Sequence, residues 1–338
     1  MHQARTRCRS RTPALLLAAL CLAAIPKPAA AFGENVQHWA REFPKTDFTK
    51  RGVDFSEIRS TGAFRNSIPP IVQPVFRPAS QVQGIGDKEP VLSVTLDLGT
   101  HGYPIRVLIW HELVNDTISG KPVLVSYSPL SNSGAAYLRT LEGKEMLFGN
   151  TGRLRHFNTI MYDRESGSWW QQFSGSAIVG ANVGKNLTRV ATVVQSWERF
   201  REAHPEADVL MPPNPTARPY GTTPYVGMDR AGSKGLDAYL LPPEVKPFER
   251  VVVIGDEAWT VKRLKDKGAV EKPGFYLGLV PGQNSAHDTK WISFGRDVGN
   301  VIARHRDPAS GDWVTNPHTV AFAFAFKAFY PGGVLYTW

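Results

Sequence analysis

Residues 110–134 read W-H-E-L-V-N-D-T-I-S-G-K-P-V-L-V-S-Y-S-P-L-S-N-S-G. In this stretch a histidine, two acids, an asparagine and a turn rich in hydroxyl groups lie between apolar runs. Residues 122–127 carry the β-branched and aromatic side chains that favour a strand. The stretch therefore predicts a strand-rich region that gathers a compact set of polar groups.

Strand signals continue on both sides of this stretch. They cover residues 92–98, 104–110, 135–140, 146–148, 158–162, 169–173, 189–195 and 250–254. The sequence D-R-E-S-G at 163–167 predicts a turn, because its glycine permits a positive φ. Ser196 predicts the cap of a short helix over 197–203, which Pro205 helps to end. The expected fold is a β-rich α+β fold with short helices.

Four motifs of the first half recur in the same order in the second half. They are [LI]-G-x3-[YW]-x-[IV]-x2-L at 98–108 and 254–264, F-G at 148–149 and 294–295, D-x2-S-G-x-W at 163–169 and 307–313, and an aromatic residue followed by H-P or Y-P at 200–205 and 326–331. Their order predicts an internal duplication into two related antiparallel or mixed β units. Residues 110–134 fall in a surplus of the first unit that has no counterpart in the second.

Composition and turn signals divide the chain further. We expect a signal peptide at 1–31, an N-terminal extension at 32–89, a first β-rich half at 90–210 that carries the site, a linker at 211–246 rich in proline and glycine, and a second β-rich half at 247–338.

The first residues have the pattern of a secretory signal peptide. Four arginines between Arg5 and Arg11 precede an apolar run at 14–25, and Ala29-Ala30-Ala31 offers a cleavage site. The apolar run is shorter than the about 20 residues of a spanning helix. We therefore expect cleavage near Ala31, export to the periplasm or beyond, and no transmembrane span after cleavage.

Removal of the leader changes the charge and the cysteine content. The leader holds five basic residues and no acid, so its removal lowers the net charge from +9 to +4, and it also holds both cysteines, Cys8 and Cys21. A modest charge without a basic cluster disfavours nucleic-acid binding. A cysteine-free chain has no disulfide and no thiolate ligand, and we expect no haem, no iron–sulfur cluster and no thiolate metal site.

The quoted stretch also resembles the core of a prokaryotic family, domain of unknown function 3179. The similar residues are W-H-E-L-V-N-D-T at 110–117, G-K-P-V-L-V-S-Y at 120–127, M-Y-D-R at 161–164 with Ser168, Trp170 and Gln172, and the G-x-A-I-x-G block at 175–180. The likeness covers roughly residues 88–338. The resemblance implies no established reaction.

One departure from the family pattern concerns two cysteines. Where members typically show C-P-L-C, this chain has Ser128-Pro129-Leu130-Ser131. A C-x-x-C pair binds a metal or cycles between dithiol and disulfide, and serine does neither at ordinary pH. The resemblance therefore implies that any thiol function of the family is absent here.

His111 and Asp116 are the candidate catalytic residues, because an acid can orient a histidine as a general base or metal ligand. The alternative is that His111 ties a strand end to neighbouring backbone. Glu112 is a second acid, but its position next to His111 on a strand would point it elsewhere. Histidines 101, 111 and 156 are candidate metal ligands, although no compact spacing supports a metal site.

Ser128, Ser131, Arg164, Trp170 and Gln172 are the candidate ligand-binding residues. A serine nucleophile lacks support, because the chain has no G-x-S-x-G elbow and a hydroxyl-rich turn can satisfy its own backbone. We expect a non-redox ligand-binding or accessory protein of the bacterial envelope, with a small molecule or envelope protein as partner. The alternative is a hydrolase-like or metal-dependent enzyme that uses His111 and Asp116.

Overall fold

The computed structural model describes residues 36–230 and 241–338. The predicted signal peptide and residues 231–240 of the predicted linker lie outside the described residues. The described residues form the helices α1 (Val36–Glu42), α2 (Ile105–His111), α3 (Trp197–Ala203), α4 (Val261–Lys267) and α5 (Ala323–Phe329), and the single 3-10 turns η1 (Phe55–Glu57), η2 (Ala79–Gln81), η3 (Pro129–Ser131), η4 (Met228–Arg230) and η5 (Ile292–Phe294).

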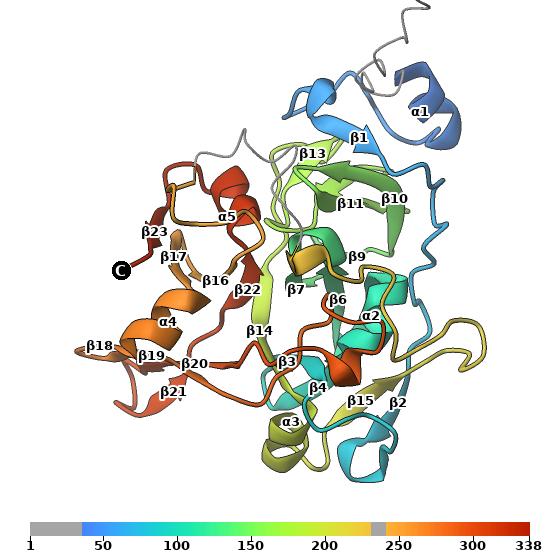
Figure 1. The fold of residues 1–338 in the computed structure, drawn as a ribbon. Helices are drawn as coiled ribbons and strands as arrows, with labels where there is room; N and C mark the ends of the chain where they lie inside the picture. The colour runs from blue at the N-terminus through green and yellow to red at the C-terminus, as the bar shows by residue number, and fades with distance from the viewer. Residues whose placement is uncertain (1–35, 231–240) are drawn as a thin grey trace, which may run out of the picture. The chain divides into compact units, whose positions relative to one another are not determined.

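An eight-stranded mixed sheet forms the body of the first half (Figure 1). Its order is β2 (Val75–Pro78), β15 (Asp208–Met211), β4 (Gly99–Pro104), β3 (Pro90–Leu96), β14 (Arg189–Ser196), β7 (Ser133–Leu138), β6 (Lys121–Ser128) and β5 (Leu113–Ile118). The β15–β4 pair is parallel, and the other pairs are antiparallel. The quoted stretch supplies the β5–β6 hairpin and the start of β7.

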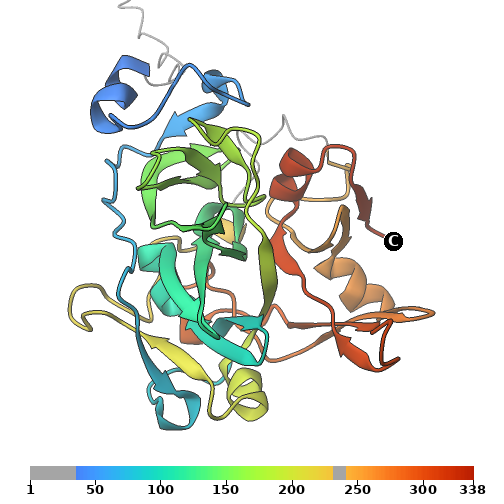
Figure 2. The ribbon, with the colours of Figure 1, turned by 180° about the vertical axis from the view of Figure 1, so that it is seen from behind.

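A five-stranded antiparallel sheet completes the first half. Its order is β1 (Ile58–Ser60), β10 (Phe148–Arg155), β11 (Asn158–Asp163), β12 (Trp169–Gln171) and β13 (Ala177–Val179). Both views show α1 next to β1 of this sheet (Figures 1 and 2). The hairpin β8 (Thr140–Leu141) and β9 (Lys144–Glu145) connects β7 with β10. The segment before residue 90 thus contributes β2 to one sheet and β1 to the other.

Two four-stranded sheets make up the second half. One has the order β22 (Thr319–Phe322), β16 (Arg250–Ile254), β17 (Glu257–Thr260) and β23 (Val334–Tyr336), and the other has the order β18 (Val270–Lys272), β19 (Phe275–Val280), β20 (Asn300–Arg306) and β21 (Trp313–Thr315). The fold is β-rich α+β, as the sequence predicts.

The strand order confirms the two related units. The first contains β15-β4-β3-β14 and the second β23-β17-β16-β22. In both series the first pair is parallel and the other pairs are antiparallel. Helices α2 and α4 follow β4 and β17, and each spans seven residues. Their first residues, Ile105 and Val261, are the residues that the first repeated motif aligns. The same chain path is therefore built twice.

The later motifs agree with this duplication in two cases out of three. The N–H of His204 ends α3 on the carbonyl of Phe200, and the N–H of Tyr330 ends α5 on that of Phe326. The D-x2-S-G-x-W motifs form equal turns, with the glycine N–H bonded to the aspartate carbonyl at 3.0 and 2.8 Å. The F-G match is wrong, because 148–149 begin β10 whereas Phe294 ends η5.

Residues 105–111 form a helix, which corrects the predicted strand at 104–110. All but two of the seven side chains of α2 are buried, so the apolar run shows no clear face and its period cannot separate a buried helix from a buried strand. Pro104 precedes the helix with φ −58°, a value that suits proline at a helix start. As a result the residue after His111 lies at a helix end, not within a strand.

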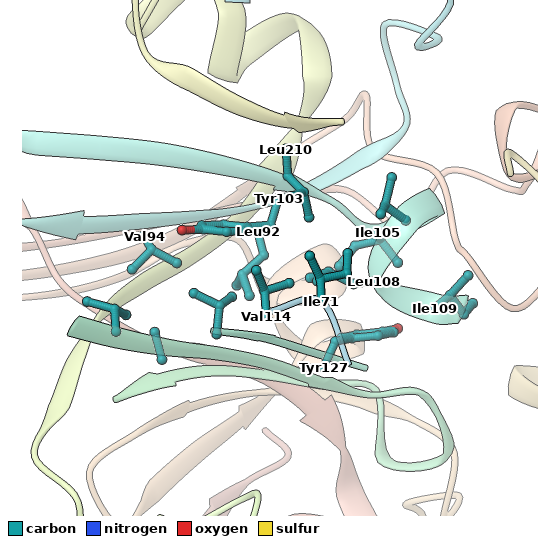
Figure 3. Close-up of a cluster of buried hydrophobic side chains, with 14 of the residues drawn as sticks. Ile71, Leu92, Val94, Tyr103, Ile105, Leu108, Ile109, Val114, Tyr127 and Leu210 are labelled. Carbon is teal, nitrogen blue, oxygen red and sulfur yellow. The ribbon is translucent and has the colours of Figure 1, made fainter. Parts of the chain in front are cut away.

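The main core packs α2 against the eight-stranded sheet (Figure 3). Ile105, Leu108 and Ile109 of the helix meet Leu92 and Val114 of the strands. Complete burial of one such side chain contributes about 2 kcal/mol, so this core fixes the end of α2 firmly. Within residues 36–230 and 241–338, no helix has the length and hydropathy needed to cross a membrane.

Candidate functional site

Glu112 occupies the C-cap of α2 with φ 58° and ψ −34°, a conformation that side-chain-bearing residues rarely adopt. Its N–H bonds to the carbonyl of Leu108, and its own carbonyl accepts the N–H of Tyr127 at 2.8 Å. These bonds turn the carboxylate towards β10 and β11. There its Oε2 accepts the amide of Asn150 at 2.6 Å and the hydroxyl of Thr159 at 2.9 Å.

Burial raises the pKa of Glu112 to about 7, although the hydrogen bonds from Thr159 and Asn150 act in the opposite direction. The residue is 5% exposed. A carboxyl whose pKa lies near neutrality can hold or release a proton at physiological pH, a property common at functional sites.

Ser128 connects with Glu112 through Thr159. The N–H of Thr159 donates to the Ser128 hydroxyl oxygen at 3.1 Å, and the two hydroxyls also lie 3.1 Å apart. A hydroxyl carries a single hydrogen. When Thr159 donates to Glu112, Ser128 is therefore the donor to Thr159. We call Glu112, Ser128, Asn150 and Thr159 the Glu112 cluster.

Ser131 belongs to a second buried group, the serine network, which comprises Ser126, Ser131, Ser133, Asn158 and Gln172. The Asn158 Nδ2 lies 2.9 Å from the Ser131 hydroxyl, 3.1 Å from that of Ser133 and 2.7 Å from Oε1 of Gln172. The Gln172 Nε2 donates to the Ser126 hydroxyl at 3.1 Å. The members are at most 1% exposed, so the network joins β6 and β7 to β11 and β12 without reaching solvent.

A buried histidine of the second half contacts η3, the turn that contains Ser131. His287 Nε2 lies 2.9 Å from the carbonyl of Pro129, between the two serines. Burial, the largest effect, lowers the pKa of His287 to about 3, so the ring is neutral at pH 7. A neutral ring can donate through one nitrogen only, and here that nitrogen is Nε2.

His111 and Asp116 have separate partners, which contradicts the expected pair. His111 bonds through Nδ1 to the carbonyl of Pro69 at 2.8 Å and through Nε2 to the Tyr220 hydroxyl at 2.7 Å. Burial lowers its pKa, so the neutral ring donates to Pro69 and accepts from Tyr220. The alternative stated from the sequence, that His111 ties a chain segment to backbone, describes this geometry.

Asp116 pairs instead with His101 and Tyr103 of β4. Its Oδ2 lies 2.9 Å from His101 Nδ1 and also accepts the Tyr103 hydroxyl. Its backbone carbonyl accepts Arg139 at 3.1–3.2 Å. Asp116 therefore joins β5 to neighbouring elements and leaves His111 to Tyr220.

The three candidate metal ligands lie in three different surroundings. His101 contacts Asp116, His111 contacts Tyr220, and His156 lies 3.4 Å from Glu57. Within the part of the chain that the structure describes, no group of three or more His, Cys, Asp or Glu side chains is arranged to hold a metal ion.

Trp170 and Gln172 are buried, and Arg164 lies elsewhere. The Trp170 Nε1 donates to Oδ2 of Asp163 at 2.8 Å, and its ring packs edge-on against Phe148. The structure therefore joins Ser131 and Gln172 in one network and Ser128 with Glu112 in another. It leaves Trp170 in the core and brings Arg164 to a separate hollow.

This Arg164 hollow has a volume of about 410 Å³ and lies where residues 43–46 of the N-terminal extension meet the turn after β11. It is lined by Phe43, Pro44, Lys45, Thr46, Arg65, Asn66, Tyr162, Asp163, Arg164 and Gly167. The Thr46 hydroxyl donates to the Gly167 carbonyl at 2.6 Å, and Lys45 Nζ donates to that of Arg164 at 2.9 Å. The extension thus forms one wall.

The cations of the hollow are weakly paired. The guanidinium of Arg65 lies 5.5 Å from the ring centroid of Phe43 and 5.9 Å from that of Tyr162. The guanidinium groups of Arg65 and Arg164 have no acidic partner within residues 36–230 and 241–338, whereas the backbone N–H of Arg65 donates to the carboxylate of Glu42. The carboxylate of Asp163 is wholly buried and bonds to Ser166 and Trp170. The hollow therefore offers cationic donors beside an aromatic face.

Glu112, Thr159, Asn158 and Arg65 are the residues that sequence reasoning missed. Glu112 stands in the quoted block, but the predicted strand at 104–110 gave its side chain the wrong direction. Asn158, Thr159 and Arg65 carried no sequence signal, because their partners lie far away in the chain: Thr159 bonds to Ser128 across 31 positions.

Comparison with known proteins agrees with the motif evidence. A family model described as "Protein of unknown function (DUF3179)" matches residues 65–333. Comparisons with curated proteins and with solved structures give no match. The match covers both β-rich halves, and the chain therefore belongs to this family of proteins of unknown function.

Proposed function

We propose that this chain is an exported, non-redox binding or accessory protein of the bacterial envelope, and that the Arg164 hollow takes a small organic anion. The single observation that carries the proposal is that the guanidinium groups of Arg164 and Arg65, beside Tyr162, lack acidic partners among the described residues. Cations left free next to an aromatic ring suit a carboxylate attached to a flat apolar group.

The non-redox part of the proposal rests on Ser128 and Ser131. Both hydroxyls are fully buried and bonded to Thr159 or Asn158. These positions support the packing of β6 and η3 against β11, and a serine hydroxyl has no redox chemistry at ordinary pH. Export rests on the signal-peptide pattern at residues 1–31.

The size of the hollow also supports a small ligand. A volume of about 410 Å³ falls within the about 300–1,000 Å³ typical of small-molecule sites. Aromatic and apolar atoms of Phe43, Pro44 and Tyr162 provide contact area, and Asn66 and Lys45 add hydrogen-bond donors at the rim. A ligand of one ring and one carboxylate would meet both kinds of wall.

An NMR titration with benzoate, and with neutral benzamide as its isosteric comparison, tests the proposal. Benzoate should bind saturably and more tightly than benzamide, because only benzoate gains a charge-assisted bond. Arg164→Gln should weaken benzoate binding about tenfold, since such a bond contributes about 1.5 kcal/mol or more. Arg59→Gln removes an exposed arginine of β1 outside the hollow and is the matched control. Equal binding of both probes, or no effect of Arg164→Gln, would overturn it.

The second candidate function is an acid–base enzyme. In it Glu112, and not His111 with Asp116, is the catalytic acid or base. One observation favours it: the hydrogen-bond chain Ser128–Thr159–Glu112 could carry the hydroxyl proton to a carboxylate whose pKa lies near 7. Complete burial of Ser128 counts against it. Hydrolysis of p-nitrophenyl acetate that is lost equally in Ser128→Ala and Glu112→Gln would support this candidate.

A further inference from the structure

A second hollow, of about 490 Å³, lies where the second half meets the segment before it, between η4, the residues before β16, helix α4 and the loop after η5. Its lining is strongly basic, with the six cations Arg230, Lys246, Arg250, Lys262, Lys265 and Arg296. Asp229 and Glu249 are its acidic lining residues among those described.

The floor of this hollow is a built ionic structure. The wholly buried carboxylate of Asp229 accepts Arg250 at 2.8 Å, Arg296 at 2.8 Å and the Ser285 hydroxyl at 2.6 Å. Arg250 in turn lies 5.6 Å from the ring centroid of Phe322. Asp229 therefore holds two guanidinium groups in fixed places, and its own charge is fully compensated.

A charge count over the described residues leaves the hollow positive. Asp288 pairs with Arg296 at 3.0 Å and with Arg230, and Lys262 pairs with Asp266. Lys246 and Lys265 have no acidic hydrogen-bonding partner among the described residues. Six cations thus face four carboxylates, those of Asp229, Glu249, Asp266 and Asp288. Burial raises the pKa of Glu249, which disfavours its negative charge.

We propose that this hollow binds a small oxyanion that carries two or more negative charges, such as a phosphate ester or a polycarboxylate. Preorganised guanidiniums recognise phosphate or carboxylate through paired N–H groups, and flexible lysines add charge at the rim. The site differs from the Arg164 hollow, where aromatic walls favour a singly charged ring compound. It stands independently of the proposed function.

Isothermal titration calorimetry of the full chain with pyrophosphate, and separately with citrate, tests this site. Saturable binding is expected for at least one of the two probes, and the stronger one identifies phosphate or carboxylate as the natural chemistry. Binding should weaken as salt rises, because the lysines are exposed. Lys246→Gln combined with Lys265→Gln should lower the affinity about tenfold, at about threefold for each charge.

Two controls make the outcome decisive. Lys267→Gln removes an exposed charge from the same helix α4 but outside the hollow, and it should bind as the unmodified chain does. Arg59→Gln, which lies outside both hollows, should also leave pyrophosphate and citrate binding unchanged. If neither probe binds, or if the double lysine variant binds as Lys267→Gln does, the proposal is overturned.

Discussion

The serine network and the Arg164 hollow use similar polar chemistry, but their side chains are paired in opposite ways. In the network, the Asn158 amide lies within hydrogen-bond distance of three acceptors and its oxygen accepts two further N–H groups. In the hollow, the guanidinium groups of Arg164 and Arg65 lack acidic partners among the described residues. Paired, buried groups stabilise a fold, whereas unpaired groups at a rim have free capacity for a ligand.

The comparison also distinguishes residues whose type suggests a chemical role from residues that are free to perform one. The motif residues Ser131 and Gln172 are already hydrogen-bonded within the serine network, Ser131 to Asn158 and Gln172 to Ser133. Glu112 is buried and hydrogen-bonded as well, but its raised pKa allows it to exchange a proton near neutral pH. Three substitutions test these distinctions in order of expected effect.

The largest effect is expected for Asn158→Ala. The change leaves the hydroxyls of Ser131 and Ser133, the amides of Gln171 and Gln172 and the N–H of Phe173 without their common partner. Because each buried unpaired group costs about 1–3 kcal/mol, we expect a loss of about 4 kcal/mol in the free energy of unfolding. Urea denaturation measures it. Asn214→Ala, in an exposed loop, should change stability by less than about 0.5 kcal/mol and is the control. A small loss for Asn158→Ala would refute the tight pairing.

The next effect concerns Glu112 and its pH dependence. Folding raises the pKa of Glu112 from 4.5 to about 7, so the folded state binds the proton more tightly than the unfolded chain. The contribution of Glu112 to the free energy of unfolding is therefore largest below pH 4.5. It falls as the pH rises from 4.5 to 7 and stays constant above pH 7. The total fall is about 3 kcal/mol.

Glu112→Gln should remove that fall, because glutamine does not titrate. Denaturation of both proteins at pH 5 and pH 8 gives the difference: the stability of the unmodified chain relative to Glu112→Gln should be lower at pH 8. Other acids titrate equally in the two proteins and cancel. An unchanged difference between the two pH values would show that Glu112 is ionised with an ordinary pKa.

Much of the fold follows from the sequence, while most of the site does not. Alternation and turn residues located strands such as β6 and β16, and the helix over 197–203 was predicted with its exact bounds. The repeated motifs indicated the duplication, since Phe200 and Phe326 serve the same helix end in both units. These features depend on neighbours within a few residues or on a repeated pattern.

The site depends on contacts between distant segments, and these leave no periodic signal. The pairing of Asp116 with His101 rather than His111 arises because β4 and β5 meet through the core, while α2 turns His111 towards Tyr220. The run at 105–109 could not reveal that turn, because its four apolar side chains are buried and show no period that separates a helix from a strand. Charge pairing at the hollows is likewise decided by partners more than 60 positions apart, such as Asp229 and Arg296.

The smallest effect on stability is expected for Arg164→Gln, and this contrast with Asn158→Ala completes the comparison. The Arg164 guanidinium has no acidic partner among the described residues, and the backbone bonds of residue 164 to Leu147 and Lys45 survive the change. Unfolding free energy should therefore change by less than about 0.5 kcal/mol, while benzoate binding falls. Denaturation and NMR titration of the same sample measure both quantities. A stability loss near that of Asn158→Ala would mean that Arg164 supports the turn after β11, and the hollow would then have no free cation to offer a ligand there.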